Sequence, residues 1–159
     1  MNKPTLVRAL VSLLEQEIAR ATQAAQRTRE GAVHEEARPE NDKDTRALEA
    51  SYLARGQAQR VVDLEQESKL IAFMSVPDFG SNDAIDLGAV VELESDETTK
   101  WYFLAPAAGG RSLVHEGIAI DVITPQAPLG RALIGRMRGD DLELRVAGRM
   151  RELTIVDVR

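Results

Sequence analysis

The amino-acid composition of the chain changes near residue 75, and this change limits the folds that the chain can adopt. Residues 1–74 hold a single glycine before Gly56 and are rich in Ala, Leu, Glu, Gln and Arg, which favour helix. From Ser75 onward, VPDFGSNDAIDLG gathers turn-forming residues, and short β-branched runs follow it. We therefore predict a helical part over residues 1–74, a linker over residues 75–84 and a β-rich domain over residues 85–159.

Two apolar patterns in the helical part predict a pair of helices. In the first, apolar residues recur at steps of three and four, as on one face of a helix: Leu6, Leu10, Leu13, Leu14, Ile18, Ala21, Ala24 and Ala25. A second, less regular pattern follows Pro39: Leu48, Tyr52, Ala58, Val61, Val62, Leu70 and Phe73. We predict that the two stripes face each other in an antiparallel hairpin. Its arms of about 28 residues would measure about 40 Å at about 1.5 Å per residue.

The second arm of this hairpin should begin near residues 41–45. Pro39 lacks a backbone N–H and restricts the residue before it, so it discourages helix. Asn41 and Asp44 stand three apart in a pattern that resembles a capping box.

Acidic side chains gather where the hairpin would turn. The segment HEEARPENDKD, residues 34–44, lies between the predicted helices, and its acids outnumber Arg38 and Lys43. One interpretation is a solvated loop whose acids favour the start of the second helix through the helix macrodipole. The other is a group of carboxylates that positions a divalent cation, because hard oxygen ligands suit Mg²⁺ and the ion would relieve their repulsion. The sequence of the tip leaves both interpretations open.

The second half of the chain predicts a small sheet. Five segments have strand-like patterns: LGAVVELE, KWYFLA, AIDVIT, LELRVAG and RELTIVDVR. A short helix is predicted from Pro128 to Ile134, with Gly135 at its end. Trp101, Tyr102 and Phe103 are expected in the sheet core, since no basic residues surround them as in a platform for bases. The predicted fold class is α+β: an N-terminal antiparallel helical hairpin followed by a small antiparallel β domain with one short helix.

Composition excludes several kinds of function. The net charge of −6 has the wrong sign for a protein that covers nucleic-acid phosphates with lysine and arginine. The chain has no cysteine, so neither disulfides nor thiolate metal sites are available. His34 and His115 have no ligand-spaced companions, and we expect both to be ordinary surface residues. No secretory signal or membrane-spanning run is visible, so we expect a soluble, cytoplasmic protein without membrane contact.

The stretch TPQAPLGRALIGRMRGDDLELRV resembles a motif of a known family. Its centre, APLGRALIG at residues 127–135, is followed by Gly139 and Asp140. This order is similar to the Ser-Pro-Leu-Gly-Arg-Ala-Leu-Leu-Gly and Gly-Asp pattern in the carboxy-terminal domain of the GreA/GreB transcription elongation factors. The resemblance covers about half of the chain by motif and nearly all of it by layout, since these factors place a helical hairpin before an FKBP-like domain.

The resemblance implies an accessory factor of bacterial RNA polymerase that is not itself an enzyme. In the family, the globular domain sits at the rim of the secondary channel and the hairpin reaches the catalytic centre. Carboxylates at its tip help hold a second Mg²⁺, so that the polymerase cleaves the 3′ end of its own backtracked transcript. We therefore expect a monomer without a stably bound cofactor, which shares Mg²⁺ with the polymerase and meets the nascent RNA 3′ end only indirectly.

The resemblance also suggests residues for the metal. The family tip reads Asp-Leu-Lys-Glu-Asn-Ala-Glu-Tyr. Asp42 and Asp44, with Glu40 assisting, keep its acid, lysine, acid order at a shorter interval and are predicted to share the Mg²⁺. An alignment that starts from Tyr52 instead places Thr45 and Leu48 at the acidic positions, which would abolish the pair.

A second group of residues is predicted to bind the polymerase. These residues match the loop that many Gre proteins press against the rim: Gln126, Ala127, Pro128 and Leu129. Ala127 replaces the usual serine. Pro128 equally suits the start of a helix, and both roles can hold together.

Two other functions stay open. The tip of this chain differs from the family tip in the spacing of its acids. It therefore also fits a regulator or inhibitor that occupies the channel without stimulating cleavage. The FKBP-like fold raises a peptidyl-prolyl isomerase as a third candidate, but no aromatic-lined proline pocket can be traced and a fold alone confers no activity.

Overall fold

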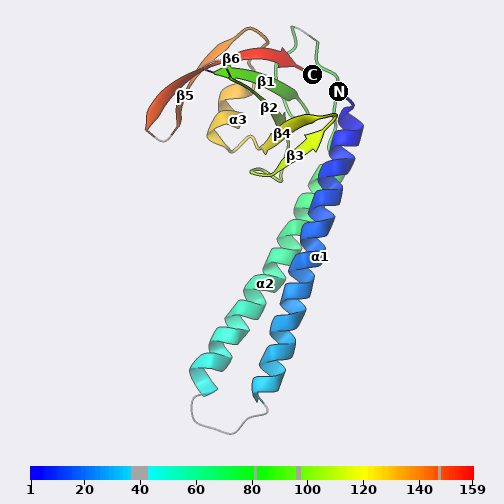
Figure 1. Ribbon diagram of the computed structural model, residues 1–159, viewed down its shortest axis with the longest axis vertical. Helices are drawn as coiled ribbons and strands as arrows, with labels where there is room; N and C mark the ends of the chain where they lie inside the picture. The colour runs from blue at the N-terminus through cyan, green and yellow to red at the C-terminus, as the bar shows by residue number, and fades with distance from the viewer. Residues whose placement is uncertain (37–42, 81, 96–97, 147) are drawn as a thin grey trace. The chain divides into compact units, whose positions relative to one another are not determined.

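The structure, a computed structural model, describes residues 1–159 except 37–42, 81, 96–97 and 147, and the side chains of residues 32–36, 43–47, 50, 146 and 149. It contains two long helices, four strands, a short helix and two further strands in chain order (Figure 1). The chain divides into two compact units. We call Ser12–Lys69 the hairpin unit, and Met1–Val11 together with Leu70–Arg159 the sheet unit. The predicted domain limits at residues 74 and 84 stay a prediction.

The described residues of the sheet unit form one six-stranded sheet in the order β3-β4-β2-β1-β6-β5. Its strands are β1 (Val90–Ser95), β2 (Thr98–Leu104), β3 (Ser112–His115), β4 (Ile118–Ile123), β5 (Asp141–Val146) and β6 (Arg149–Val158). Neighbours pair antiparallel except β2 and β4, which are parallel. The predicted α+β class, with a mostly antiparallel sheet after the helices, is confirmed.

Strand β3 was not predicted from the sequence. It has only four residues, and it joins β4 through a two-residue turn at Glu116 and Gly117. Both turn residues have positive φ, 51° and 77°, which gives a twist that suits antiparallel hairpins. A strand this short carries too little alternation to stand out in a sequence.

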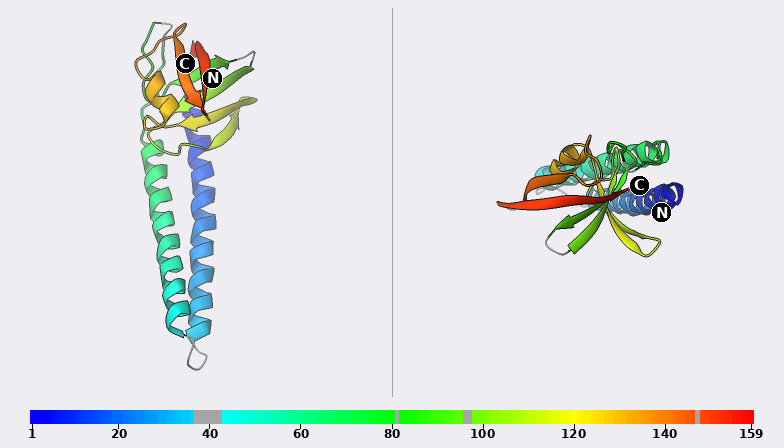
Figure 2. Two further views of the ribbon diagram at one scale, coloured as in Figure 1. Left: turned by 90° about the vertical axis from the view of Figure 1, so that its left-hand side faces the viewer. Right: turned by 90° about the horizontal axis from the view of Figure 1, so that it is seen from above.

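The main core lies between one face of the sheet and the short helix α3 (Pro128–Leu133), as Figures 1 and 2 show. Along β1, Val91 and Leu93 point into this core, in the alternation expected of a sheet with a covered face. Leu133 of α3 and Leu104 of β2 are fully buried with them. Apolar burial of this kind is the main stabilising contribution to such a unit.

The predicted aromatic core residues of β2 have different environments. Phe103 is fully buried, as predicted. Tyr102 is partly buried and packs against the core cluster. Trp101 is also partly buried, and the guanidinium carbon of Arg159 lies 4.6 Å from the centre of its ring. The prediction therefore holds fully for Phe103 and in part for its two neighbours.

Helix α3 agrees closely with its prediction. Pro128 occupies the first turn, where its missing N–H leaves no helical bond unmade. Gly135, just past the end, has a φ of 80°, a backbone conformation that glycine adopts without strain. The Gly135 N–H donates to the carbonyl of Ile85, so the end of the helix is tied to the segment before β1.

The hairpin unit consists of parts of α1 (Lys3–Glu36) and α2 (Lys43–Ala72), which run side by side in Figures 1 and 2. Helix α2 begins within the predicted window. Leu14 and Leu64 are the most deeply buried described side chains of this unit, and Glu17 and Arg60 approach each other across the two arms at 4.0 Å. Although both helices are long, none in the described part of the chain is apolar enough over a sufficient length to cross a bilayer.

The predicted composition of the second apolar stripe is wrong. Most of its large members are exposed: Leu48, Tyr52, Val62, Leu70 and Phe73. Leu64 and Ile71, which the prediction omitted, are buried instead. Leu64 and Ile71 are seven residues apart and share one face of the helix, while Val62 is two residues from Leu64 and lies on the opposite face. The predicted stripe was irregular in its spacing because it combined residues from both faces of α2.

A pair of leucine substitutions tests this correction. We expect Leu64→Ala to lower the free energy of unfolding of the hairpin by about 2–5 kcal/mol, because it leaves a cavity in a buried seam. Leu48→Ala should change it by less than about 0.5 kcal/mol, because that side chain is exposed. Urea unfolding followed by far-UV circular dichroism measures both. Equal losses would contradict the assignment of the two faces.

Candidate functional site

The residues predicted to bind the polymerase lie together in one turn at the start of α3. Gln126 and Pro128 are exposed, whereas Ala127 and Leu129 are partly buried. Leu129 packs against the core cluster. The turn is closed by a hydrogen bond from the Ala127 N–H to the carbonyl of Thr124, at 3.0 Å. The chain thus presents a polar and a proline side chain on a turn that its own leucine fixes to the core.

Two residues of the APLGRALIG motif support this turn. Arg131 donates from Nη1 to the carbonyl of Gln126 at 2.7 Å, so its guanidinium braces the exposed backbone. Gly130 is buried, and a Cβ placed there would lie 2.0 Å from the carbonyl oxygen of Thr124. The motif glycine therefore permits close backbone packing. Close packing thus explains the glycine at position 130, and no phosphate-binding role is needed to explain it.

The acids predicted to share Mg²⁺ are placed only in part. Glu40 and Asp42 lie outside the described residues. Asp44 falls in the first turn of α2, and its side chain is outside the described set. Among the residues that the structure describes, no three or more His, Cys, Asp or Glu side chains are grouped to hold a metal ion. The metal role of the tip stays a prediction.

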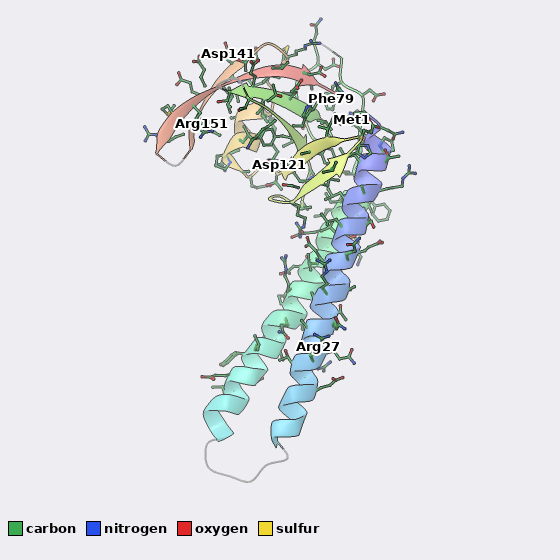
Figure 3. All side chains as sticks on the ribbon, in the orientation of Figure 1. Met1, Arg27, Phe79, Asp121, Asp141 and Arg151 are labelled. Carbon is green, nitrogen blue, oxygen red and sulfur yellow. The ribbon has the colours of Figure 1, made fainter. Side chains whose placement is uncertain are left out.

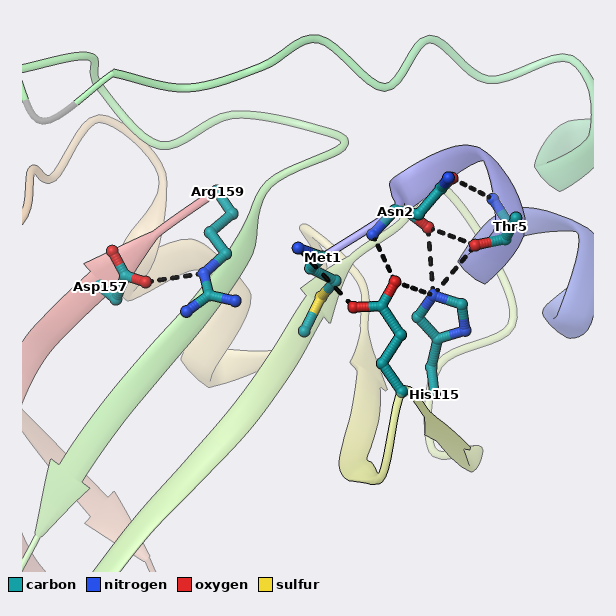
Figure 4. A network of polar contacts seen from close by, with 7 residues as sticks. Met1, Asn2, Thr5, His115, Asp157 and Arg159 are labelled. Carbon is teal, nitrogen blue, oxygen red and sulfur yellow. Dashed lines mark hydrogen bonds and ion pairs between the residues drawn. The ribbon is translucent and has the colours of Figure 1, made fainter.

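A network of polar contacts holds the first turn of α1 to the β3–β4 turn within the sheet unit (Figure 4). Asn2 caps the helix, since its Oδ1 accepts from the Thr5 N–H at 3.1 Å. The Asn2 N–H donates to Glu116 Oε1 at 2.9 Å. This bond is the main reason why the pKa of Glu116 is lowered, and the nearby amino terminus and His115 add to the effect. The contact is therefore retained at neutral pH and weakens as the pH falls through the lowered pKa of Glu116.

His115 corrects a prediction, because its side chain is only 12% exposed and belongs to this network. Its Nε2 lies 3.1 Å from the carbonyl oxygen of Asn2 and 3.1 Å from Thr5 Oγ1, which itself donates to that carbonyl. Glu116 Oε1 is 3.6 Å away. Each of these neighbours offers a lone pair, so the hydrogen must reside on Nε2. His34 lies in α1, and its side chain is outside the described residues.

Lys3 makes a second anchor for the same turn. Its side chain is buried, and its ammonium donates to the carbonyls of Pro77 and, at 3.4 Å, Gly88. It also lies 4.8 Å from the centre of the Phe79 ring. Burial lowers the pKa of Lys3, and the charge of Asp78 partly opposes this shift. Lys3 thus ties the start of α1 to the segment that precedes β1.

Sequence reasoning missed both anchors for a physical reason. The partners of Asn2, Lys3 and Thr5 lie more than seventy residues away along the chain. Only the helix cap formed by Asn2 could be recognised in the sequence, because an asparagine just before a helical segment is a common start of a helix. A lone histidine and a lone lysine carry no pattern that could locate their partners.

Comparison with known proteins assigns the sheet unit to a class of transcription factor. Residues 80–159 match the family model described as "Transcription elongation factor, GreA/GreB, C-term". This match spans half of the chain, and the chain therefore belongs to the GreA/GreB family. No curated protein matches it.

Several solved structures are similar to the chain. The GreA factor homolog 1 (Gfh1) protein of Thermus thermophilus is 23% identical, with 94% of each chain covered and a TM-score of 0.39. Thermus aquaticus Gfh1 is 20% identical, with 95% of this chain and 94% of that chain covered and a TM-score of 0.41. A prokaryotic GreA/GreB elongation factor from Nitrosomonas europaea is 20% identical over 60% of this chain and 78% of its own, with a TM-score of 0.37.

A methyl group at Gly130 tests the packing role of the motif glycine. We expect Gly130→Ala to lower the free energy of unfolding of the sheet unit by about 1–3 kcal/mol or more, because the new Cβ collides with the backbone of Thr124. Thermal unfolding followed by Trp101 fluorescence reports it. In the control, Gly56→Ala meets no atom within 4 Å on α2 and should stabilise the hairpin by about 0.5–1 kcal/mol. A neutral Gly130→Ala would refute the packing role.

The position of the proton on His115 can be tested with two amides. The Nε2 of glutamine can take the place of the imidazole Nε2, so His115→Gln should keep the first turn of α1 protected. The shorter side chain of His115→Asn should lose about 1 kcal/mol of hydrogen bonding, so the amide of Leu6 should exchange about fivefold faster. Hydrogen exchange measured by NMR separates the two. Equal exchange in both variants would show that the Nε2 donor does not hold the helix.

Proposed function

We propose that this protein binds bacterial RNA polymerase and stimulates the polymerase to cleave its own backtracked transcripts. It would act as a cytoplasmic monomer, without a stably bound cofactor and without catalytic activity of its own. The observation that carries the proposal is the combination of a GreA/GreB sheet unit with two long paired helices joined at an acidic segment. The family resemblance implies that such a hairpin enters the secondary channel.

The seam of the hairpin unit supports a slender projection. Toward the turn, its partly buried described residues are mostly small: Ala21, Ala25, Thr28, Ala54 and Gln57. Small side chains let two helices approach closely, so the pair needs little width in this part. The larger buried leucines, Leu14 and Leu64, lie farther from the turn along both helices.

Asp42 and Asp44, with Glu40 assisting, are the proposed residues of the tip. Their carboxylate oxygens are the ligands that Mg²⁺ prefers, and the family resemblance implies that the polymerase holds the same ion. A second Mg²⁺ stabilises the attacking oxygen when a phosphodiester is displaced in line. The part of this chain is to present negative oxygens to another protein's catalytic centre, and this requires no permanent metal site of its own.

The turn at Gln126, Ala127, Pro128 and Leu129 is the proposed contact with the rim of the channel. Its exposed side chains and its braced backbone suit a rigid contact that changes little on binding. Ala127 stands where the family pattern has serine, so this contact would lack one hydroxyl group.

A second function is favoured by the sequence of the tip. Asp42 and Asp44 are separated by one residue, which is closer than the two acids of the family pattern. A tip with this geometry also fits a factor that occupies the channel and slows transcription without cleavage. Slower elongation with no release of 3′ fragments would select this alternative.

A cleavage assay on backtracked complexes tests the main proposal. The wild type should release short 3′ fragments, whereas Asp42→Ala with Asp44→Ala should bind the polymerase normally and lose stimulation by at least about tenfold. Glu30→Ala, which removes an exposed acid of α1 outside the proposed pair, serves as the control and should cleave like the wild type. Full stimulation by the double variant would rule out the role of these two acids.

A further inference from the structure

The hairpin unit has two parts that differ in what they bury. We call residues 12–20 and 59–69 the basal segment, and residues 21–31 and 48–58, which lie closer to the turn between α1 and α2, the distal segment. In the basal segment two side chains are almost fully buried: Leu14 and Leu64. In the distal segment none of the described side chains is buried, and the partly buried ones are mostly small: Ala21, Ala25, Thr28, Ala54 and Gln57.

The two halves of the distal segment face each other across a weak seam. Glu17 and Arg60, 4.0 Å apart, show which parts of the two arms lie level. Because the arms run antiparallel with the same rise per residue, Ala21 of α1 lies about level with Gln57 of α2. Burial of an alanine methyl group stabilises a seam much less than burial of a leucine side chain. The distal seam therefore holds the arms together less strongly than the basal seam does.

The side chain of Gln57 weakens the distal seam further. Its Oε1 is buried and has no hydrogen-bond partner among the described residues. This oxygen loses its hydrogen bond to water when the arms close and regains it when they part. Closing the seam at Gln57 is thus opposed by a loss of hydration.

Two glycines lower the helix stability of the distal segment. Gly31 lies in α1 and Gly56 in α2, and a Cβ at either position would meet no described atom beyond its own helical turn within 4 Å. Packing therefore requires neither glycine. Glycine inside a helix is less stable than alanine, because it has more conformational freedom to lose.

Larger apolar side chains do not compensate for these losses. Leu48, Tyr52 and Leu53 are 55%, 66% and 57% exposed, so they add little to the seam. Figure 3 shows side chains of this part of the hairpin, Arg27 among them, that stand on the surface of the helices. Isolated helices shorter than about 12–15 residues are marginal in water, so each half of the distal segment depends on a partner that holds it weakly.

We propose that the distal segment, because its seam is weak, opens as a separate unit while the basal segment stays folded. The small seam residues, the buried oxygen of Gln57 and the two glycines all favour this opening. Ala25 and Ala54 lie about three turns inside the helix ends Glu36 and Lys43, so the opening goes beyond the fraying of a last turn. Weakly packed parts of stable proteins open locally in this way. The end of the hairpin can thereby change its geometry without loss of the basal seam.

Native-state hydrogen exchange of the full-length chain, measured by NMR at increasing urea concentration, tests this proposal. We expect the amides of residues 21–27 and 51–57 to exchange about a hundredfold or more faster than those of Leu14 and Leu64. Their exchange should also depend less on urea, because a partial opening exposes less surface than global unfolding does. Equal rates with equal urea dependence would show that the two segments open together, and would overturn the proposal.

A substitution in the basal segment separates the two openings. Leu64→Ala should speed exchange in the basal segment about thirtyfold or more, because it leaves a cavity there, and should change exchange in the distal segment by less than about twofold. The form with an open distal segment keeps the basal seam, so loss of the Leu64 side chain destabilises that form as much as the closed form. Equal acceleration in both segments would contradict two separate openings.

A substitution in the distal seam tests the cause of the opening, in a variant expected to fold at least as well as the wild type. Gln57→Leu replaces the unpartnered amide by an apolar side chain and should slow exchange of the distal amides about tenfold or more. Gln23→Leu makes the same change at an exposed position of the distal segment, and as the control it should alter exchange by less than about twofold. Unchanged distal exchange in Gln57→Leu would show that the seam does not set the opening, which would also overturn the proposal.

Discussion

The hydrogen bonds that fix the first turn of α1 are the contacts on which the sheet unit depends, because they join its N-terminal segment to residues more than seventy positions away. Lys3 donates to carbonyls of the segment before β1, and His115 holds the Asn2 carbonyl from the β3–β4 turn. These groups are largely buried, so leaving one unpaired would cost about 1–3 kcal/mol. Because α1 continues without a break from Lys3 to Glu36, the same helix supplies one arm of the hairpin unit.

Much of the fold could be predicted because its signals are local. The glycine-poor first half predicted two helices, and α2 begins where Pro39 and the Asn41–Asp44 pair placed it. Pro128 and Gly135 predicted the limits of α3 almost to the residue. The APLGRALIG motif identified the family, and the structure adds that Gly130 is required for close packing on Thr124.

The errors arose where the deciding information is not local. The exposed and buried apolar residues of α2 differ only in the face they occupy, and Val62 cannot be told from Leu64 without knowing where α1 lies. His115 has no companion in sequence, because its partners are at the other end of the chain. The metal role of Asp42 and Asp44 could be predicted only through the family, since their number and spacing fit a solvated loop equally well.

In the proposed function, the acidic turn between α1 and α2 reaches the catalytic centre of RNA polymerase. Fe²⁺ bound in place of Mg²⁺ at that centre would generate hydroxyl radicals, which cut only the chain segments near the ion. If the turn reaches the centre, radicals formed in the complex will cut this protein at or beside the turn between α1 and α2. Cuts confined to the sheet unit, or none in a complex that has formed, would contradict it.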